Sequence, residues 1–278
     1  TNVTDSTVTM RLNAANGGHL DFNYRLLPNS YMVDLTVQAS GMQNFFSPST
    51  KSMNIEWKQR ARQMEKGYNF EQRYTSLTYK PVDDSFDYLS ETKDEKETIP
   101  ESLDWVAFKN QYFSCVFMAE QNFDNATLES KMEQQGSGYM KNYAADMKTA
   151  FDPTGAKASH MQFYFGPNHF KTLLASNDLS FKDKDQELED LVYLGWPIIR
   201  LINRWFTINL FDWLSGWGLS MGMVILLMTI IVKVLVLPTT WKSFISSAKM
   251  RALKPYVDKI NAKYPKQEDA LKKQQETM

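Results

Sequence analysis

Lys233 is the one charged residue in a stretch of 29 residues that runs from Trp213 to Trp241. Placing an ammonium group at the centre of a bilayer costs about 2.5 to 3.5 kcal/mol, so a lysine in this position calls for a reason. Such a cation attracts acidic and polar groups and lowers the barrier to their entry into apolar surroundings. The residue therefore predicts an electrostatic role in moving polypeptide segments.

Thr229, Leu226 and Gly222 share a helix face with Lys233, because residues three and four apart lie one above the other. We expect this face to line a hydrated groove that is completed by helices outside this chain. In the alternative, the membrane span ends near Val232 and Lys233 extends its stem to the headgroups. Trp241 makes the better interface anchor, however, and it places Lys233 eight residues inside, roughly 12 Å at 1.5 Å per residue.

The other reactive side chains form no catalytic or metal-binding pattern. His19, His160 and His169 occur at no metal-ligand spacing, and the single cysteine, Cys115, cannot form an intramolecular disulfide. The sequence contains no P-loop, GxSxG or GxGxxG motif. We therefore expect neither an enzyme activity nor a metal or other cofactor.

The apolar stretch is long enough to cross a membrane, since a helix needs about 20 apolar residues to span a ~30 Å hydrocarbon core. We predict a transmembrane helix over residues 215–241. Tryptophans gather at membrane interfaces, and four of them suit this position. They are Trp205, Trp213, Trp217 and Trp241.

An amphipathic helix is predicted directly before the span, over residues 197–214. Its polar residues, Arg200 and Arg204 among them, cluster on one side, while isoleucine, tryptophan and phenylalanine occupy the rest. We expect this helix to lie in the membrane interface with its polar stripe toward water. A core helix of the preceding domain is the alternative.

Short runs of alternating apolar and polar residues fill the chain from residue 8 to about 165, and they predict an all-β domain over residues 1–175. The runs lie at 8–12, 19–27, 31–38, 53–59 and 105–119. Alternation of this kind is typical of an antiparallel β-sandwich. Residues 90–102 are polar enough to predict a solvated loop, and a turn at 165–167 is expected to lead into a helical linker over 176–196.

The tail at 242–278 is basic and helical in propensity, with Pro255 and Pro265 as expected interruptions or helix starts. Residues 239–278 carry nine Lys and Arg against four acidic residues, whereas residues 1–196 carry 19 against 27. Because basic residues mark the cytoplasmic end of a span, we expect the tail inside the cell and the β domain outside. Attraction of the tail to anionic lipid and simple solvation both fit this composition.

The ends of the sequence predict an interior piece of a longer protein. The chain starts at Thr1 without a signal peptide or leading apolar segment, although an outer domain must be exported. It stops at Met278, inside a charged helical run.

Several strings follow one another in an order known from one family. They are Asp104–Phe113, Tyr164–Pro167, Trp217–Ser220, Thr229–Lys233, Leu237–Pro238 and Ala248–Pro255. Together with the order of the predicted parts, they resemble the YidC/Oxa/Alb family of bacterial membrane protein insertases. The resemblance is firmest from about residue 196 onward.

This resemblance implies a supersandwich-like outer domain in the periplasm and an anchor in the bacterial inner membrane. It implies nascent membrane proteins as substrates, with the lipid bilayer, the Sec translocon and a ribosome at the basic tail as partners, and no nucleic acid substrate. Lys249, Arg251, Lys254 and Pro255 then belong to the start of a cytosolic hairpin. Lys233 matches the family's groove cation, usually an arginine, and keeps the charge without the planar fork.

A second function class stays open from the residues themselves. A single-span receptor could bind glycan or peptide with its outer sandwich and signal through its basic tail. That reading predicts no further span after Met278, whereas an insertase predicts several.

Overall fold

The computed structural model describes residues 1–15, 17–47, 49–180 and 185–263, and the chain divides into two compact units. The first unit comprises Thr1–Tyr193 and the second comprises Leu194–Met278. The first unit thus includes residues 185–193, which the sequence predicts to be part of a linker.

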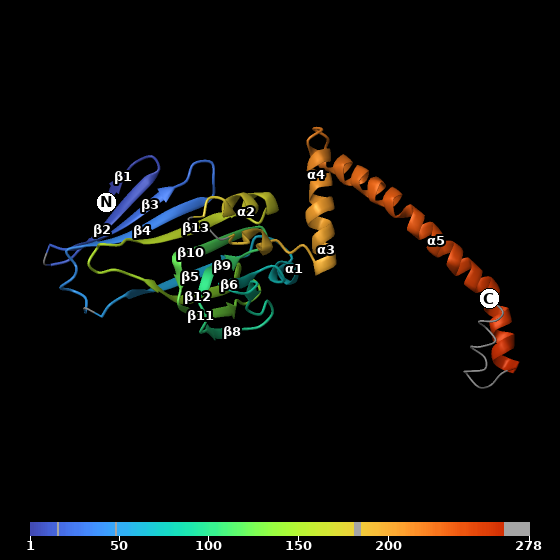
Figure 1. Ribbon diagram of the computed structural model, residues 1–278, viewed down its shortest axis with the longest axis horizontal. Coiled ribbons are helices and arrows are strands. Elements are labelled where there is room, and N and C mark those ends of the chain that lie inside the picture. The colour runs from blue at the N-terminus through green and yellow to red at the C-terminus, as the bar shows by residue number, and fades with distance from the viewer. Residues whose placement is uncertain (16, 48, 181–184, 264–278) are drawn as a thin grey trace. The chain divides into compact units, whose positions relative to one another are not determined.

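Antiparallel strands build the first unit, which is mostly β-sheet (Figure 1), as the alternating pattern predicts. The strands are β1 (Asn2–Val3), β2 (Thr7–Asn13), β3 (His19–Leu26), β4 (Met32–Ser40), β5 (Ser52–Arg62), β6 (Ser76–Pro81), β7 (Asp87–Tyr88), β8 (Glu95–Ile99), β9 (Leu103–Lys109), β10 (Phe113–Phe123), β11 (Asn125–Met132), β12 (Tyr139–Ala150) and β13 (Ser159–Pro167). Helix α1 (Tyr68–Gln72) connects β5 to β6.

The strands form two sheets. The larger has nine strands in the order β1-β2-β3-β4-β13-β10-β9-β6-β7, and the smaller has four in the order β5-β12-β11-β8. Every strand pairs with its neighbours in antiparallel fashion. The predicted antiparallel all-β domain is therefore confirmed.

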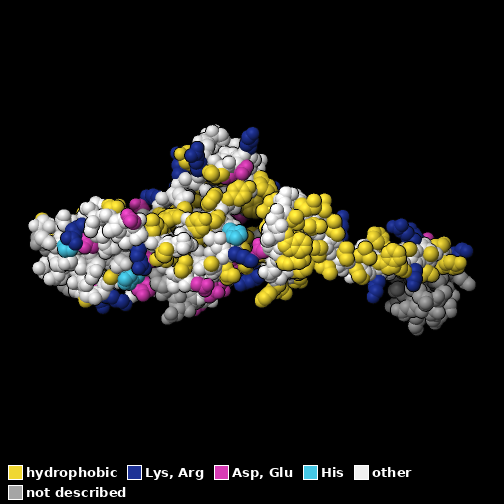
Figure 2. Space-filling view, turned by 90° about the horizontal axis from the view of Figure 1, so that it is seen from above, with side chains coloured by type: hydrophobic (Ala, Val, Ile, Leu, Met, Phe, Trp, Pro, Cys, Tyr) yellow, Lys and Arg dark blue, Asp and Glu magenta, His cyan; other side chains and the backbone are white. Residues whose placement is uncertain are grey.

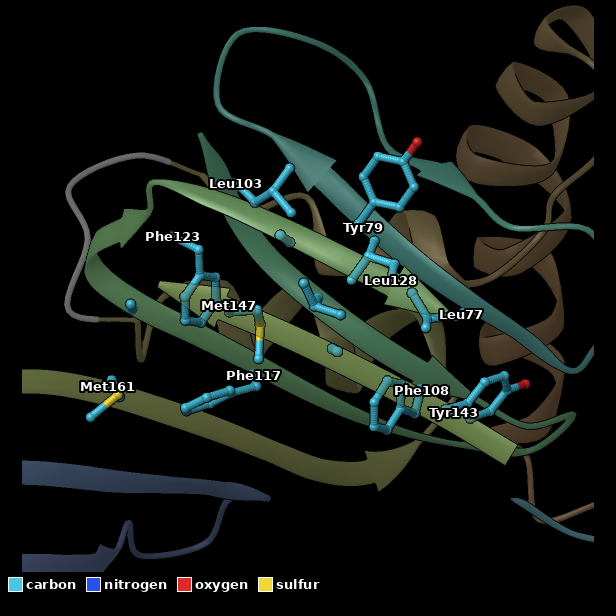
Figure 3. Close-up of a cluster of buried hydrophobic side chains, with 14 of the residues drawn as sticks. Leu77, Tyr79, Leu103, Phe108, Phe117, Phe123, Leu128, Tyr143, Met147 and Met161 are labelled. Atoms are coloured by element: carbon cyan, nitrogen blue, oxygen red, sulfur yellow. The ribbon is translucent and has the colours of Figure 1, made fainter. Parts of the chain in front are cut away.

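The core lies between the two sheets, where alternate residues of each strand meet (Figure 3). Trp57 of β5 stacks on Phe108 of β9 with ring centroids 3.9 Å apart, and Phe117 stacks on Phe163 at 4.1 Å. Phe123 and Leu128 are fully buried beside them. Aromatic side chains contribute large buried areas, so this layer provides much of the stability of a unit that has no disulfide.

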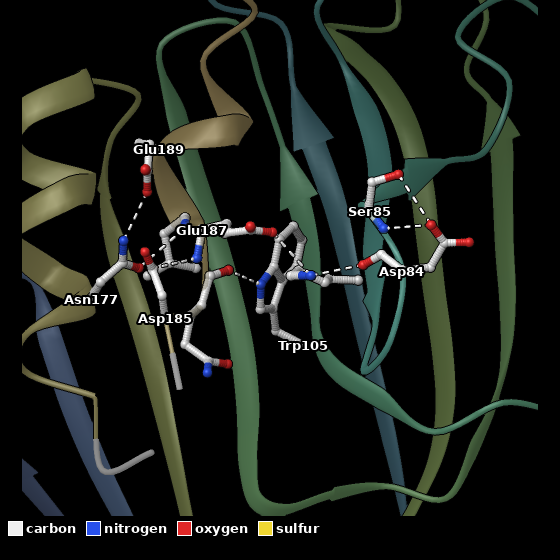
Figure 4. Close-up of polar contacts among 10 residues, drawn as sticks. Asp84, Ser85, Trp105, Asn177, Asp185, Glu187 and Glu189 are labelled. Atoms are coloured by element: carbon white, nitrogen blue, oxygen red, sulfur yellow. Dashed lines mark hydrogen bonds and ion pairs between the residues drawn. The ribbon is translucent and has the colours of Figure 1, made fainter. Parts of the chain in front are cut away.

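A second apolar cluster covers the opposite face of the large sheet, where helix α2 (Phe170–Asn177) and the 3-10 helix η1 (Leu188–Leu191) pack on it. The indole of Trp105 donates to the carbonyl of Gln186 at 2.8 Å, and Lys80 pairs with Glu187 at 3.0 Å (Figure 4). These polar contacts hold the segment that ends the first unit against the sheet.

Three sequence predictions are wrong in the first unit. Residues 90–102 contain the strand β8, which pairs with β11 and buries Ile99. The run 105–119 is two strands, β9 and β10, joined by a tight connection in which Asn110 donates to Phe113 at 2.8 Å. The predicted turn at 165–167 lies inside β13.

Gly166 has a packing reason for its place in β13. A Cβ atom there would lie 2.5 Å from Cζ of Tyr164 and 2.8 Å from Cγ of Tyr31. The glycine therefore makes room for two tyrosine rings, and it does not mark a turn.

The second unit is helical. Helix α3 (Pro197–Ile202), a π-helical turn η2 (Asn203–Thr207) and helix α4 (Ile208–Ser215) follow one another directly, and helix α5 runs from Met221 to Lys263. Pro197 occupies the first turn of α3, where its missing N–H costs no hydrogen bond.

Candidate membrane segment and substrate groove

Helix α5 is long and apolar enough to cross a membrane over Met221–Lys259. Most of its side chains are exposed in the second unit, and Val224 is the buried exception in its first turns. Apolar side chains also gather over the helical second unit in the space-filling view (Figure 2). An apolar helix of this length that is not covered by its own chain fits a bilayer and does not fit the core of a soluble domain.

The four predicted groove residues lie on α5 and share one face. Gly222, Leu226, Thr229 and Lys233 follow one another at spacings of four, three and four residues, and all four are exposed. The Thr229 hydroxyl donates to the Ile225 carbonyl at 2.8 Å, which satisfies its proton inside the helix and leaves its oxygen as an acceptor. This face therefore carries a cation and an acceptor about one helical turn apart.

A shallow, open hollow between exposed side chains lies beside Lys233 along the same helix. Its lining residues are Val232, Lys233, Val236, Leu237, Thr240, Trp241 and Phe244. Pro238 lies within this stretch of helix and has no N–H to donate to the carbonyl of Val234. The site thus combines one ammonium group with an apolar hollow and a weakened turn of backbone.

The segment 197–214, predicted as one helix, is helical as α3, η2 and α4, with a change of helical period that the sequence pattern does not reveal. The side-chain amide of Asn209, in α4, donates to the carbonyl of Trp205 in the π-helical turn at 2.8 Å. Trp205 is exposed, as is the adjacent Arg204, while Arg200 is half-buried one turn earlier. A π-helical turn contains an extra residue, so it rotates α4 relative to the polar stripe of α3.

Of the other predicted interface residues, Trp213 and Trp217 lie at the junction of α4 and α5, and Trp241 lies within α5. Trp213 of α4 and Trp217 in the following turn form an edge-to-face pair with ring centroids 4.6 Å apart. Gly218 supplies the positive φ of +71° that this turn requires. Trp217 therefore precedes the long helix, and Trp241 lies within it, eight residues after Lys233.

The basic residues Lys249, Arg251 and Lys254 lie on the same continuous helix as the apolar span. Pro255 is inside α5, so the predicted interruption at this residue is wrong. Pro265 lies outside the described residues.

Sequence reasoning missed a buried lysine in the first unit, which lies near the half-buried Lys109 and Glu91. Lys141 is fully buried and donates to the carbonyl of Ser90 at 2.9 Å. Burial lowers the pKa of Lys141 to about 8, lowers the pKa of Lys109, and raises the pKa of Glu91. A lysine at an inward position of an alternating strand is the signal that could have revealed it.

The histidines are dispersed. His160 contacts Thr36 at 3.3 Å and His169 contacts Thr172 at 2.8 Å, each through Nδ1. Within the described ranges, no group of three or more histidine, cysteine or acidic residues is arranged to hold a metal.

Two family models match the chain. The one described as the YidC periplasmic domain matches residues 1–211, and the one described as 60Kd inner membrane protein matches residues 213–278. Between them they cover both units.

Curated relatives bear the name "Membrane protein insertase YidC". The relative from Phocaeicola vulgatus is 72% identical over 278 residues, which are 100% of this chain and 45% of the relative. Those from Bacteroides fragilis and Porphyromonas gingivalis are 58% and 39% identical over 100% and 99% of the chain, each covering 44% of the relative. The chain thus spans less than half the length of these relatives. A galactose mutarotase related enzyme from Lactobacillus acidophilus is 12% identical over 59% of this chain and 69% of that one, at a TM-score of 0.32 that supports no inference.

Proposed function

The chain belongs to the YidC family of membrane protein insertases, and we propose that it forms part of a protein that moves hydrophobic segments of nascent membrane proteins into the lipid bilayer through a hydrophilic groove. The observation that carries this proposal is Lys233, a cation placed well inside an apolar helix and beside a hollow. The name of the relatives, which match along the whole chain, supports it.

The proposed mechanism begins with charge. An ammonium group attracts a carboxylate about 4 Å away by roughly 4 kcal/mol where the effective dielectric constant is near 20, against about 1 kcal/mol in water. Lys233 would therefore lower the cost of bringing an acidic or polar stretch of a substrate below the headgroups. The Thr229 oxygen would accept hydrogen bonds on the same face.

The apolar hollow would receive the other part of the substrate. Val236 and Leu237 line it, and Lys233 stands at its side, so a hydrophobic segment could lie against α5 while its polar flank stays near the cation. Release into lipid needs no covalent step, because the bilayer itself favours the apolar segment. The protein acts in this scheme as a path and not as an enzyme.

Lys233 should hold its substrate loosely. A lysine provides a point charge on a flexible stem, whereas an arginine provides a planar fork that binds a carboxylate through two parallel hydrogen bonds. Loose pairing suits a transfer site, since the substrate must leave again.

The proposed topology follows from charge. The nine basic residues among 239–278 favour the cytoplasmic side for the end of α5, and the first unit then lies in the periplasm. The exposed row on α3, with Ile198 and Leu201, would lie in the outer interface. We extend the proposal to action alone or beside the Sec translocon, with the basic part of α5 as a contact for the ribosome.

The test uses the full-length protein and a single-span reporter whose translocated flank carries one aspartate or, in a matched version, one asparagine. Lys233→Ala should slow insertion of the aspartate reporter about tenfold, which corresponds to about 1.4 kcal/mol. It should affect the asparagine reporter less, because asparagine carries no charge for the ammonium group to attract. Lys233→Arg should retain activity.

Lys242→Ala is the matched control, since it removes one positive charge from the same helix nearer its basic end. Insertion that is unchanged by Lys233→Ala for both reporters would instead mean that Lys233 extends to the headgroups. No observation favours the single-span receptor alternative.

A further inference from the structure

Strand β2, near one end of the large sheet, is paired along its whole length on one side only. β3 pairs with all seven of its residues, Thr7–Asn13. On the other side, the two-residue strand β1 pairs with Val8 and Thr9. No other strand in the described ranges pairs with this side of β2, so residues 10–13 have an open edge. The N–H and C=O groups of alternate residues at such an edge can bind another strand.

The inner face of this part of the sheet is apolar and uncovered. The register places Met10 opposite Phe22 and Leu12 opposite Leu20, and both residues of β3 pack against the core. Opposite residues of an antiparallel pair point to the same face, so Met10 and Leu12 point inward too. Met10 is 51% exposed, Leu12 is 60% exposed, and Val3, which its pairing places on the same face, is 65% exposed. A contiguous patch of exposed apolar side chains marks an interaction site.

The other ends of the two sheets are protected, whereas β2 is not. β7, at the opposite end of the large sheet, is two residues long. β5 and β8, at the ends of the small sheet, carry exposed charged side chains such as Lys58 and Lys96. The one charged residue of β2 is Arg11, which lies on the outer face and pairs with Asp21 at 2.7 Å. Because short strands and charges discourage further pairing, β2 is the end that needs cover.

We propose that another part of the same protein, outside residues 1–278, packs on the inner face of β2 and pairs with its open edge, which completes the sandwich at this place. One added strand beside β2 would lie in the plane of the large sheet and would leave Met10 and Leu12 open above it. The cover must therefore also form a second layer. The inference goes beyond the proposed function, which uses the second unit only.

Length and tethering favour a part of the same protein as the occupant. The relatives from Phocaeicola vulgatus and Bacteroides fragilis match this chain over 45% and 44% of their length, so more than half of each lies outside the matching part. A tethered part is present at a high effective concentration, which a separate partner lacks. Cover that belongs to the same protein also removes the hazard of aggregation at an open apolar edge.

The register predicts the side chains of the strand that pairs with β2. Its residues opposite Met10 and Leu12 should be apolar, because they point into the completed sandwich. Its residue opposite Arg11 should be polar or acidic, because Arg11 lies on the outer face.

The first test measures how fast single cysteines react with a maleimide in the purified full-length protein, from which all other cysteines have been removed. Leu12 and Arg11 are neighbours on β2 and both are exposed within residues 1–278, so Leu12→Cys and Arg11→Cys would react alike if the inner face were open. We expect Leu12→Cys to react at least about tenfold more slowly, because a covered side chain reacts only while its cover is open. Urea should make the two rates equal.

Leu26→Cys provides a second reporter, in case Leu12→Cys does not fold. Leu26 lies on the same face of β3 as Phe22 and is 57% exposed within residues 1–278. It should be protected in the full-length protein like Leu12→Cys. Circular dichroism of each variant confirms that it is folded.

The second test identifies the occupant. A photoreactive p-benzoylphenylalanine replaces Met10 in the full-length protein, and mass spectrometry locates the crosslinked peptide after irradiation. We expect an intramolecular crosslink to a peptide outside residues 1–278. The same replacement at Arg11, on the outer face, should not give this crosslink.

Several outcomes would overturn the proposal. Equal rates for the inner and outer cysteines would show that the inner face stays open in the full-length protein. A crosslink from position 10 that joins two copies would show that a dimer covers the face. A crosslink confined to residues 1–278 or to detergent would likewise exclude a cover from elsewhere in the same protein.

Discussion

Lys141 is the residue at which burial has its clearest electrostatic consequence. Desolvation lowers the pKa of this ammonium from 10.5 to about 8, although Glu91, Asp94 and Glu95 act in the opposite direction. The unfolded chain keeps its proton up to the ordinary pKa, whereas the folded chain gives it up near pH 8. Burial of the protonated Lys141 therefore lowers the free energy of unfolding below pH 8. This destabilisation disappears as the pH rises toward 10.5.

We predict that the free energy of unfolding of the wild-type chain, relative to Lys141→Met, increases by up to about 3 kcal/mol between pH 8 and pH 10.5. Urea denaturation in detergent at several pH values, followed by far-UV circular dichroism, measures this difference. Burial raises the pKa values of Tyr79 and Tyr143 in both proteins, so the contributions of these tyrosines cancel in the difference between the two free energies of unfolding. Lys66→Met, at an exposed position, is the control. A difference in the free energy of unfolding between the wild type and Lys141→Met that stays constant with pH would contradict the prediction.

Residue identity singles out Lys233, whose role stays a prediction, but it does not single out Lys141 in the interior of the first unit. Lys233 stands out because its surroundings in the sequence are uniformly apolar, and a helix fixes which residues share its face. Lys141 lies in a polar stretch of sequence, and the groups that surround it, such as Ser90 and Glu91, are about 50 residues away along the chain. Only the pairing of distant strands creates its environment.

Strand β8 shows at the scale of an element how a polar sequence can be ordered. Its exposed residues, Lys96, Glu97 and Thr98, are those of a solvated loop, and they suit an edge strand because charged side chains discourage further pairing. Ile99 alone turns inward and is 6% exposed.

The strand predicts a stability effect that a loop would not show. Ile99→Ala should lower the free energy of unfolding by about 2 to 4 kcal/mol, because it leaves a cavity in the core. Thr98→Ala, at the neighbouring exposed position, should change it by less than about 0.5 kcal/mol. Urea denaturation of both variants measures the two free energies of unfolding. Equally small changes in the two variants would mean that Ile99 does not hold residues 95–99 against the core.

The contact between Trp105 and the carbonyl of Gln186 predicts a second element-scale effect, in the segment that ends the first unit. Trp105→Phe keeps an aromatic ring and removes the donor. Trp105→Phe should lower the free energy of unfolding by about 1 to 3 kcal/mol more than Trp57→Phe does. The ring of Trp57 contacts other aromatic rings. Urea denaturation measures the difference, and limited proteolysis should show earlier cleavage near residues 185–191 in Trp105→Phe. Equal decreases in the free energy of unfolding in the two variants would show that the hydrogen bond from Trp105 to the Gln186 carbonyl does not stabilise this segment.

Elements with a strong local period were predictable, and those that depend on neighbours were not. The runs at 19–27 and 53–59 became β3 and β5 because one face of each is buried against the core. The π-helical turn at 203–207 has no signature in a 3.6-residue period, and Pro255 was tolerated inside α5. The place of β5 at the end of the small sheet could not be foreseen, since sequence patterns do not give the order of strands in a sheet.

At the scale of the whole molecule, the two units differ in charge and in surface. Residues 1–196 have 27 acidic and 19 basic residues, while residues 239–278 have four and nine. Between them lies the apolar part of α5 with one cation. This distribution favours an orientation in which the basic region faces the cytoplasm, because export of positively charged residues close to a span is disfavoured.

This arrangement predicts the labelling of single cysteines in the full-length protein, expressed in bacterial spheroplasts. Cys115 is half-buried and burial raises the pKa of its thiol, so it should react slowly, and Cys115→Ala, together with replacement of every cysteine outside residues 1–278, removes the background. In that variant, Ser137→Cys should react at once with a membrane-impermeant maleimide, because Ser137 is exposed in the first unit. Ser247→Cys, exposed near the basic end of α5, should react only after the membrane is disrupted. The reverse pattern would place the first unit in the cytoplasm, and the groove cation would then have to act from the opposite side.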